Sequence, residues 1–317
     1  MELSIVISLY NEEESLRELI DWIARALEGK VSSYEIIMVD DGSTDGSWNL
    51  VKELSESHPE IRGIRFRRNY GKSAALYEGF AAAKGEIVVT MDADLQDDPE
   101  EIPEMMRMIR EDGYDLVSGW KKKRYDNVIT KNIPSKIYNA TARKVTGLKL
   151  HDMNCGLKAY RNEVVKSIEV YGDMHRFIPY LAKTAGFSRI GEKEVQHQAR
   201  KYGKSKFGME RFIHGFLDLM SVWFLQRFGK KPMHFFGGAG TLMFLIGTII
   251  AIWLIIEKLV LQGAGRHFRP VTSQPLFYLA LVAVIVGVVL FLAGFLAELV
   301  SRSSQERNRY NIKETIR

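Results

Sequence analysis

The chain has 317 residues, of which 46% are hydrophobic and 26% are charged, and its formal net charge at pH 7 is +5. This composition is that of an ordinary globular protein and excludes an intrinsically disordered chain. The single cysteine, Cys155, excludes an intrachain disulfide and suits a reducing compartment.

The first 120 residues alternate between short apolar runs and amphipathic stretches. We expect strands at 3–10, 35–40, 61–66, 86–92 and 114–119, and helices at 13–27, 45–57, 71–85 and 99–113. Strands that alternate with helices of this length predict an α/β fold with a mostly parallel sheet and helices on both faces. Ligands of such sheets bind beyond the carboxyl ends of the strands, so the loops at that edge are the candidate sites.

The segment 121–208 is less periodic, and we expect a helix at 133–147 and one more strand within 187–198. Residues 209–229 are apolar with a few charged positions, which predicts an amphipathic helix at a membrane surface. We therefore divide the chain into a catalytic domain (1–208), an interface helix (209–232), a transmembrane hairpin (233–300) and a basic tail (301–317).

Two apolar runs, Phe235–Ile256 and Pro275–Ala297, contain no charged residue. Each is as long as the ~20 helical residues that span a bilayer. Two buried helices of a soluble protein are the alternative, but such helices normally carry a polar face. The sequence thus predicts two membrane helices.

The flanks of the two runs carry more cations than the loop between them, which itself holds Lys258, Arg266 and Arg269. The flanking cations are Arg227, Lys230 and Lys231 before the first run, and Arg302, Arg307, Arg309, Lys313 and Arg317 after the second. The positive-inside rule then places both flanks and the N-terminal part in the cytoplasm, with the hairpin in the inner (plasma) membrane. The first residues lack a basic n-region and a cleavage site, so we expect no signal peptide.

The stretch "MDADLQDDPE" (91–100) crowds carboxylates after a predicted strand. Pro99 suits the first turn of a helix, so Asp98 is the expected N-cap, with Glu100 and Glu101 in the first turn, where the helix dipole favours anions. Asp97 lies between this group and the earlier residues Asp92, Asp94 and Gln96, and we assign it no role.

Asp92, Asp94 and Gln96 come before that helix, and alternate residues of an extended chain point the same way. Three oxygen-bearing side chains on one side predict a site for a hard cation, Mg²⁺ or Mn²⁺. Because Mg²⁺ usually completes its shell with water and phosphate oxygens, the site predicts a metal-bound diphosphate.

A second acidic turn, "VDDGSTDGS", follows the second strand at the same edge. Asp40 and Asp41 could accept hydrogen bonds from a base or a ribose, and Asp45 or Thr44 could cap the next helix. The G-x-G-x-x-G fingerprint is missing after the first strand, which disfavours a nicotinamide enzyme. "NYGKS" shows only the end of a P-loop, so Lys72 is not a P-loop lysine.

"VISLYNEE", "VDDGSTDGS", "NYGKSAAL" and "TMDADLQDDPEE" occur in this order between residues 6 and 101. Together they resemble the nucleotide-sugar domain of the family 2 glycosyltransferases, which have the GT-A fold. With the two trailing apolar runs, the whole chain is similar to the polyprenyl-phosphate glycosyltransferases, the bacterial relatives of dolichol-phosphate mannose synthase.

The resemblance implies a role for each matching position. Tyr10, Asn11 and Glu12 would line the nucleoside pocket, and Asp40 would bind the base with Asp41 beside it. Gly71 and Lys72 would lie near the nucleotide, and Asp92 would approach the ribose or the sugar. A loop that contains Arg200, Ser205 and Lys206 would close over the phosphates. Asp94 and Gln96 would hold the metal, Asp152 would lie near the reacting centre, and Lys131 and Ser135 would contact the lipid phosphate. Many relatives have Arg at the position of Lys131.

Structural explanations compete with some of these roles. Residues 200–206 could be a solvated basic loop that faces anionic lipid, and we expect this of Lys121–Arg124. Asp152 could merely cap a turn. His151, His175 and His197 lack metal-ligand spacing, so we expect structural roles for them.

The implied activity is an inverting, metal-dependent transfer from a UDP-sugar, such as UDP-glucose, to a polyprenyl phosphate, with Asp152 and Asp94 as the catalytic pair. A GDP-mannose donor, another lipid or polysaccharide acceptor, and a catalytically silent sugar-nucleotide binder remain alternatives. The Q-x-x-R-W signature of processive synthases is missing. We expect no nucleic-acid partner, and lipid-facing surface could support a homo-oligomer.

Overall fold

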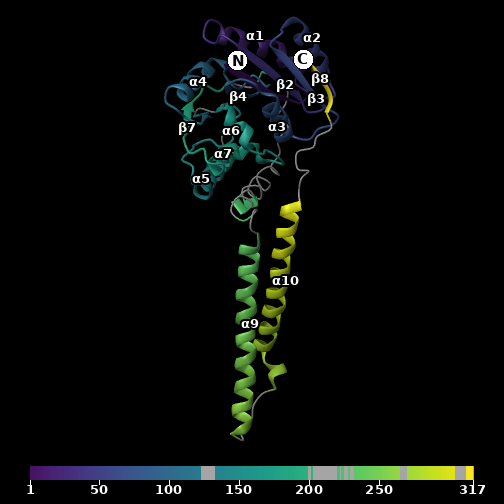
Figure 1. Cartoon of the computed structure of the whole chain (residues 1–317), viewed down its shortest axis with the longest axis vertical. Helices are drawn as coiled ribbons and strands as arrows, with labels where there is room; N and C mark the ends of the chain where they lie inside the picture. Colours follow the sequence, from purple (N-terminus) through teal and green to yellow (C-terminus); the bar gives the residue numbers. More distant parts are fainter. Residues whose placement is uncertain are drawn as a thin grey trace. The chain divides into compact units, whose positions relative to one another are not determined.

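The computed structural model describes residues 1–122, 133–198, 201–202, 232–264, 270–303 and 312–316, together with 220–221, 223–224 and 228 (Figure 1). It divides into two compact units. The first comprises Met1–Val222 and Arg307–Arg317, and the second comprises Trp223–Glu306. The predicted interface helix lies mostly outside the described residues, and its described positions are helical.

The first unit is built on one mixed sheet of eight strands in the order β7-β5-β6-β4-β1-β2-β3-β8. The strands are β1 (Leu3–Leu9), β2 (Tyr34–Asp40), β3 (Ile61–Phe66), β4 (Ile87–Asp92), β5 (Leu116–Trp120), β6 (Lys158–Arg161), β7 (Ile190–Glu194) and β8 (Ile312–Ile316). β4, β1, β2 and β3 run parallel, whereas β6 is antiparallel to β4 and β5, and β8 is antiparallel to β3. The predicted α/β class is confirmed.

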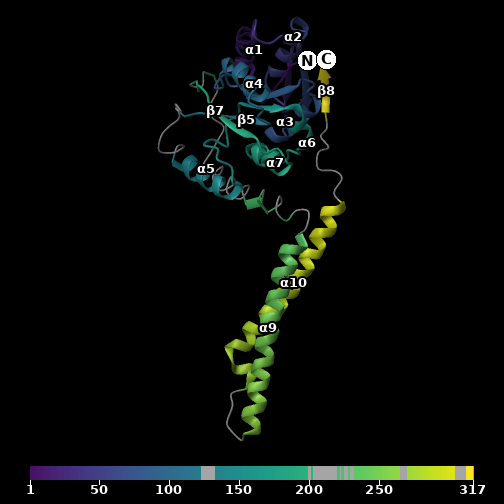
Figure 2. The same cartoon turned by 60° about the vertical axis from the view of Figure 1, so that its left-hand side comes forward.

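Helices cover both faces of this sheet (Figure 2). On one face, α1 (Glu13–Leu27), α2 (Ser47–Ser57) and α4 (Ile102–Arg110) pack on β1, β2 and β4. On the other face lie α3 (Lys72–Ala82), α5 (Ile133–Thr146), α6 (Asn162–Ser167) and α7 (Ile178–Thr184). Because both faces are covered, β1 is an almost continuous apolar run with all but one residue buried.

The predicted elements of the first 120 residues are present, with ends shifted by a few residues. α1 has the predicted bounds, whereas α3 ends at Ala82 because Ala83 adopts an extended backbone before Gly85 is reached. Two strands were not predicted. β6 has only four residues with a charge at each end, and β8 lies in the segment that we treated as a basic tail.

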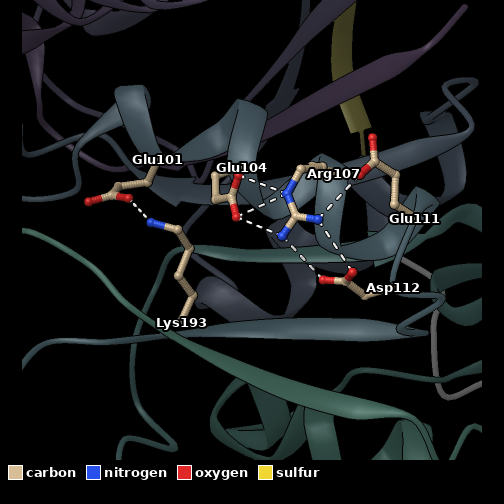
Figure 3. Close-up of polar contacts among 6 residues, drawn as sticks. All are labelled: Glu101, Glu104, Arg107, Glu111, Asp112 and Lys193. Carbon is tan, nitrogen blue, oxygen red and sulfur yellow. Dashed lines mark hydrogen bonds and ion pairs between the residues drawn. The ribbon is translucent and has the colours of Figure 1, made fainter.

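Ion pairs lie along α4 and at the turn before it (Figure 3). Arg107 lies 2.9 Å from Glu104, 3.3 Å from Glu111 and 3.2 Å from Asp112. Lys193 of β7 pairs with Glu101 in the short 3-10 turn η1 (Pro99–Glu101) that precedes α4. This last pair joins the edge strand β7 to the turn that follows the acidic stretch.

The second unit is a helical hairpin of α9 (Pro232–Gly263) and α10 (Pro275–Ser303). The candidate spans Pro232–Gly263 and Pro275–Ala297 have mean hydropathies of 2.4 and 3.0, so both are long and apolar enough to cross a membrane. Their large apolar side chains face outward, for example Trp253 with 68% exposed. Small residues form the contact, since a Cβ on Gly240 would lie 2.6 Å from the Gly287 carbonyl oxygen.

Candidate functional site

The exit of β4 carries a buried charge network centred on Asp97. Its carboxylate accepts the Asp92 N–H at 3.2 Å and pairs with Lys121 Nζ at 2.7 Å, and the residue is 1% exposed. Asp97 also forms an isolated β-bridge with His197. The residue that sequence reasoning left unassigned is therefore a structural anchor that holds the end of β4 in place.

Lys121 corrects a sequence expectation. We expected Lys121–Arg124 to be a solvated basic loop, but the Lys121 side chain is only 12% exposed and belongs to this network. Burial lowers its pKa, but the ion pair with Asp97 outweighs burial and raises the pKa overall. Lys122 is exposed as expected and lies 3.0 Å from Glu194, while 123–124 lie outside the described residues.

Asp92 is engaged by Lys72, the first residue of α3, which forms an ion pair with it. Partial burial raises the pKa of Asp92, but the adjacent Lys72 ammonium lowers it further, and the net shift is downward. Asp92 therefore stays ionised at neutral pH. The sequence placed these two residues at the same sheet edge, and the structure brings them into contact.

Asp94 and Gln96 form a tight turn directly after β4. Leu95 between them has a positive φ of 60° and a buried side chain, which leaves Asp94 and Gln96 half-buried on either side. The Gln96 N–H donates to Asp94 Oδ1 at 3.2 Å. Two oxygen-bearing side chains beside solvent fit a hard cation that takes its other ligands from water and a diphosphate.

Within the described residues, no group of three or more His, Cys, Asp and Glu could hold a metal ion. A cation held by Asp94 and Gln96 would need water or substrate oxygens to complete its shell. That requirement matches Mg²⁺, which is usually bound by one or two carboxylates and substrate phosphates rather than by an all-protein cage.

The second half of the acidic stretch forms the predicted helix start. Asp98 accepts the Glu100 N–H at 2.9 Å, which confirms it as the N-cap of η1 before Pro99. Burial raises the Asp98 pKa, and the nearby Glu101 and Glu100 add to the rise. Each glutamate has its own lysine, since Glu100 lies 3.1 Å from Lys30 and Glu101 pairs with Lys193.

Asp40 and Asp41 organise the loops at this edge. Asp40 is fully buried, accepts the Ser43 N–H at 2.8 Å and lies 3.3 Å from Arg65 Nε. Asp41 accepts the N–H groups of Tyr70 at 2.7 Å and Gly71 at 2.9 Å. Burial raises the pKa of Asp41 to about 6. The contacts of Asp40 and Asp41 with a nucleotide base remain a prediction.

Tyr10, Asn11 and Glu12 lie half-buried in the loop after β1. Asn11 adopts a positive φ of 55°, and its Oδ1 accepts the Thr44 N–H at 2.8 Å. The Glu12 N–H donates to Ser47 Oγ at 2.9 Å. These bonds fix the first loop to the loop after β2, so the two predicted nucleoside-binding segments form one rim.

Asp152 is 1% exposed and accepts the Asn154 N–H at 3.1 Å, so it does form the turn contact weighed as an alternative. Sequence reasoning missed the residue that holds it. Glu192 of β7 accepts the N–H groups of His151 at 2.8 Å and Asp152 at 3.0 Å, and lies 2.7 Å from His151 Nδ1. No motif marked Glu192, which is one glutamate among several charges in its strand.

A narrow cavity opens beside the β4 exit, between α3, β6 and the 3-10 turn η3 (Met174–Phe177). Three cations line it, Lys72, Lys158 and Arg176, together with His175 and Asn154. Burial and the neighbouring cations lower the pKa of His175 well below its usual value, so its imidazole is neutral. The motif "HDMNCGLKAY" contains Lys158, but sequence reasoning assigned that lysine no role.

The remaining predicted site residues cannot be placed. Lys131, Arg200, Ser205 and Lys206 lie outside the described residues. Ser135 lies on α5, but its side chain is outside the described part. Their roles remain predictions.

Comparison with known proteins matches residues 4–169 to the family model described as "Glycosyl transferase family 2". Dodecaprenyl-phosphate galacturonate synthase of Rhizobium johnstonii is 37% identical, covering 96% of this chain and 88% of that protein. Undecaprenyl-phosphate 4-deoxy-4-formamido-L-arabinose transferase of Aeromonas hydrophila is 34% identical, covering 99% of this chain and 94% of that protein.

Among solved structures, glucosyl-3-phosphoglycerate synthase of Mycobacterium tuberculosis in complex with Mn²⁺, UDP-glucose and glycerol 3-phosphate has a TM-score of 0.53 at 20% identity. The match covers 71% of this chain and 79% of that one, and at this identity it shows a shared fold. The resemblance seen in the sequence motifs is confirmed. The chain belongs to glycosyl transferase family 2, as a GT-A member of its polyprenyl-phosphate glycosyltransferase group.

Proposed function

We propose that the protein transfers a sugar from a nucleotide sugar to a polyprenyl phosphate at the cytoplasmic face of the plasma membrane. The products would be a polyprenyl-phosphate sugar and a nucleoside diphosphate. The names of the two curated relatives support the acceptor, because both name a polyprenyl phosphate. The apolar hairpin supports a lipid acceptor held at the membrane.

The observation that carries the proposal is the turn Asp94–Gln96 beside the ionised Asp92 at the carboxyl end of β4. Ligands of parallel sheets bind at this edge, and these oxygens suit a cation that carries a diphosphate. Asp94 and Gln96 would hold Mg²⁺ or Mn²⁺, and the Mn²⁺ in the Mycobacterium tuberculosis complex supports a divalent ion. Such an ion offsets charge on a leaving nucleoside diphosphate.

The acceptor needs little activation. A phosphate monoester has a second pKa near 6 and is mostly dianionic at pH 7, so it is already a nucleophile. Catalysis then depends on positioning, and in-line attack on the anomeric carbon would invert its configuration. Asp152 would orient the acceptor or take a residual proton, and Lys131 and Ser135 would contact its phosphate.

For the donor we propose a UDP-sugar, with UDP-glucose as the sequence-based candidate and GDP-mannose as the alternative. Tyr10, Asn11, Glu12, Asp40 and Asp41 would form the nucleoside rim. Gly71, Lys72 and Asp92 would lie near the diphosphate and the sugar. Arg200, Ser205 and Lys206 would close over the phosphates.

The test uses the full-length protein in nanodiscs, with a panel of nucleotide sugars, undecaprenyl phosphate and Mg²⁺ or Mn²⁺, and identifies the lipid product by mass. We expect transfer that excess EDTA abolishes. Asp94→Ala should abolish transfer in a protein that still folds and inserts. Asp21→Ala, an exposed carboxylate on α1, is the matched control and should keep full activity.

The outcomes separate the alternatives. Full transfer in excess EDTA, or full transfer by Asp94→Ala, would refute the metal site. Tight binding of a nucleotide sugar with no transfer to any acceptor would favour the silent binder.

A further inference from the structure

We propose that His151 binds the acceptor phosphate and takes the proton that the phosphate monoanion carries. The inference rests on the proposed function and adds a catalytic residue to it. Asp152 keeps the role of orienting the acceptor. Three observations support the inference: the two contacts that hold the ring, the nitrogen that they leave open, and the position of the ring at the edge of the sheet.

The His151 ring is held on two sides although it lies at the surface. Its side chain is 58% exposed, yet Nδ1 lies 2.7 Å from a carboxylate oxygen of Glu192 in β7. The ring also stacks on the indole of Trp120 at the end of β5, with the centroids 4.3 Å and the planes 18° apart. Holding an exposed side chain in one rotamer costs conformational entropy, so the two contacts indicate a ring whose orientation matters.

The contact with Glu192 decides which ring nitrogen is available. Because an ionised carboxylate only accepts hydrogen bonds, Nδ1 carries the hydrogen of the neutral ring, and Nε2 presents a lone pair. Within the described residues, no hydrogen bond or ion pair involves Nε2. Glu192 is itself fixed, since it is 11% exposed and also accepts the N–H groups of His151 and Asp152. A ring oriented by a fixed carboxylate, with its second nitrogen open, is suited to act as a general base.

The ring lies at the edge of the sheet where the donor is proposed to bind. Both β4 and β5 are antiparallel to β6, so β5 ends at Trp120 on the same edge at which β4 ends. The next residue, Lys121, pairs with Asp97, and Asp97 accepts the Asp92 N–H. Two contacts therefore connect the strand end that carries the stacked ring to the exit of β4.

The ring belongs to the face of the sheet on which an acceptor contact is proposed. Lys193 points towards the turn η1 before α4, because it pairs with Glu101 there. Side chains alternate along a strand, so Glu192 points to the other face, which α5 and α7 cover (Figure 2). Ser135, a proposed contact of the lipid phosphate, is on α5. This position suits the acceptor rather than the nucleoside, whose proposed rim follows β1 and β2.

The charges around the ring leave Glu192 as its ionic partner within the described residues. Lys122 Nζ lies 5.5 Å from the centroid of the same indole, but Lys122 pairs with Glu194 at 3.0 Å. Asp152 is buried and accepts a hydrogen bond within its own turn, and Lys149 is exposed. A proton gained at Nε2 would therefore be balanced by Glu192.

A histidine suits this acceptor because it titrates between pH 5 and 8, as a phosphate monoester does. When the monoanion binds, its O–H proton moves to Nε2. The freed oxygen forms a bond to the anomeric carbon, and the bond from that carbon to the nucleoside diphosphate breaks with its electron pair. At higher pH the neutral ring turns a lone pair towards a dianion, so the contribution of His151 should grow as the pH falls.

The first test uses His151→Gln in the full-length protein in nanodiscs, with undecaprenyl phosphate and the donor of highest kcat/KM in the nucleotide-sugar panel. Glutamine can still donate to Glu192 but does not titrate. At about pH 6, KM for undecaprenyl phosphate should rise at least about tenfold, as for the loss of one hydrogen bond to a charged group, and KM for the donor should change little. The difference should shrink towards about pH 8.5, where ring and phosphate no longer share a proton.

A matched control and a chemical rescue separate catalysis from structure. His58→Gln removes another histidine beside a glutamate, since His58 Nδ1 lies 3.4 Å from Glu60. This residue precedes β3, at the edge of the sheet away from the proposed site, so both KM values should stay unchanged. His151→Ala should lose activity at about pH 6 and regain part of it when imidazole is added, because free imidazole can take the same proton.

Three results would overturn the inference and leave the proposed function standing. An unchanged KM for undecaprenyl phosphate at about pH 6 would mean that His151 does not contact the acceptor. An equal loss at both pH values, without rescue by imidazole, would mean that the ring only supports its turn. A rise in KM for the donor alone would place the ring at the nucleotide. If the unchanged protein transfers no sugar to undecaprenyl phosphate, the proposed function fails and this inference with it.

Discussion

At the residue scale, the acidic stretch after β4 shows how far sequence reasoning reaches. Asp98 is the N-cap that Pro99 predicted, because that contact is local and depends on neighbouring residues. Asp97 and Lys121 could not be paired in advance, since they are far apart in the sequence and only the sheet brings them together. Local chemistry was predictable, and its long-range partners were not.

Glu192 is the other residue that sequence did not single out, and it supports a prediction. Its carboxylate accepts two backbone N–H groups at His151 and Asp152, so it is a positioning residue for the Asp152 turn. Glu192→Ala should lower kcat about tenfold or more while changing KM for the donor little, because the turn and not the donor site loses support.

Steady-state kinetics with a saturating donor measure the effect. Glu192→Gln keeps one acceptor oxygen and should recover part of kcat. Glu194→Ala, a neighbouring exposed glutamate on the same strand, is the control. A large rise in donor KM with unchanged kcat would contradict the positioning role.

Asp41 supports a prediction about pH. Burial raises its folded-state pKa to about 6, above the ordinary value of 3.8. Folding therefore favours the protonated form, and the stability from this group is full below about pH 4 and is lost as the pH rises to about 6. A shift of this size corresponds to at most about 3 kcal/mol.

Asp41→Asn has nearly the same shape and does not titrate. Its Tm should differ from that of the unchanged protein by an amount that varies between pH 4 and 6 and is constant above pH 7. As the pH rises from 4 to 6, the Tm of the Asn variant should rise relative to the Tm of the unchanged protein. Thermal unfolding of both proteins in one detergent, in steps of half a pH unit, measures this, and parallel curves would contradict it.

At the scale of elements, the regular βα units were predictable because each repeats the same hydrophobic pattern. β6 and β8 were not, because both are short antiparallel strands whose pairing is non-local. β8 had one weak signal in its alternation of Ile312, Glu314 and Ile316. We did not predict a strand from this alternation, because the basic composition of residues 301–317 indicated a tail.

β8 gives a prediction for the sheet edge. It pairs Glu314 opposite Arg65 and Ile316 opposite Gly63, and thereby covers the polar backbone of β3. Arg65 lies 3.3 Å from Asp40 and donates to the Ser43 carbonyl oxygen at 3.2 Å, so β3 supports the loop of the nucleoside rim. A chain that stops after residue 306 should have a lower Tm and weaker UDP binding, because it exposes an unpaired edge.

The control for the truncation is the full-length chain with 312–316 replaced by Val-Lys-Glu-Thr-Val, a strand of the same alternation. This control should have most of the Tm and of the UDP affinity of the unchanged protein. Calorimetric UDP titration and thermal unfolding of the detergent-solubilised proteins give the two readouts. Unchanged UDP affinity and Tm in the truncated chain would show that β8 does not support the edge.

At the scale of the whole molecule, the chain leaves the first unit near residue 222 and returns to it at residue 307. Between these points lie two helices, each long and apolar enough to cross a membrane. Because β8 pairs with β3, both ends of the hairpin must lead to the same side. If both helices span the membrane, the chain crosses it twice and returns to the side from which it started. A single crossing would leave the two ends of the hairpin on opposite sides.

This topology predicts the accessibility of single reporter cysteines. Ser273, between α9 and α10, should lie on the outer side, whereas Lys149 and Thr315, both exposed in the first unit, should lie in the cytoplasm. In spheroplasts, a membrane-impermeant maleimide should therefore label Ser273→Cys without permeabilisation. Lys149→Cys and Thr315→Cys should react only after permeabilisation, and the buried Cys155 gives a low background.

The two cytoplasmic reporters test different links in the argument. Labelling of Thr315→Cys from outside would mean that α10 ends on the outer side, and the pairing of β8 with β3 would then be wrong. Protection of Ser273→Cys until permeabilisation would mean that neither helix crosses fully. The predicted topology requires that Ser273→Cys is labelled from outside and that both other sites are protected. With that result, the candidate site at the β4 edge lies on the cytoplasmic side, where it can reach a cytoplasmic pool of nucleotide sugar.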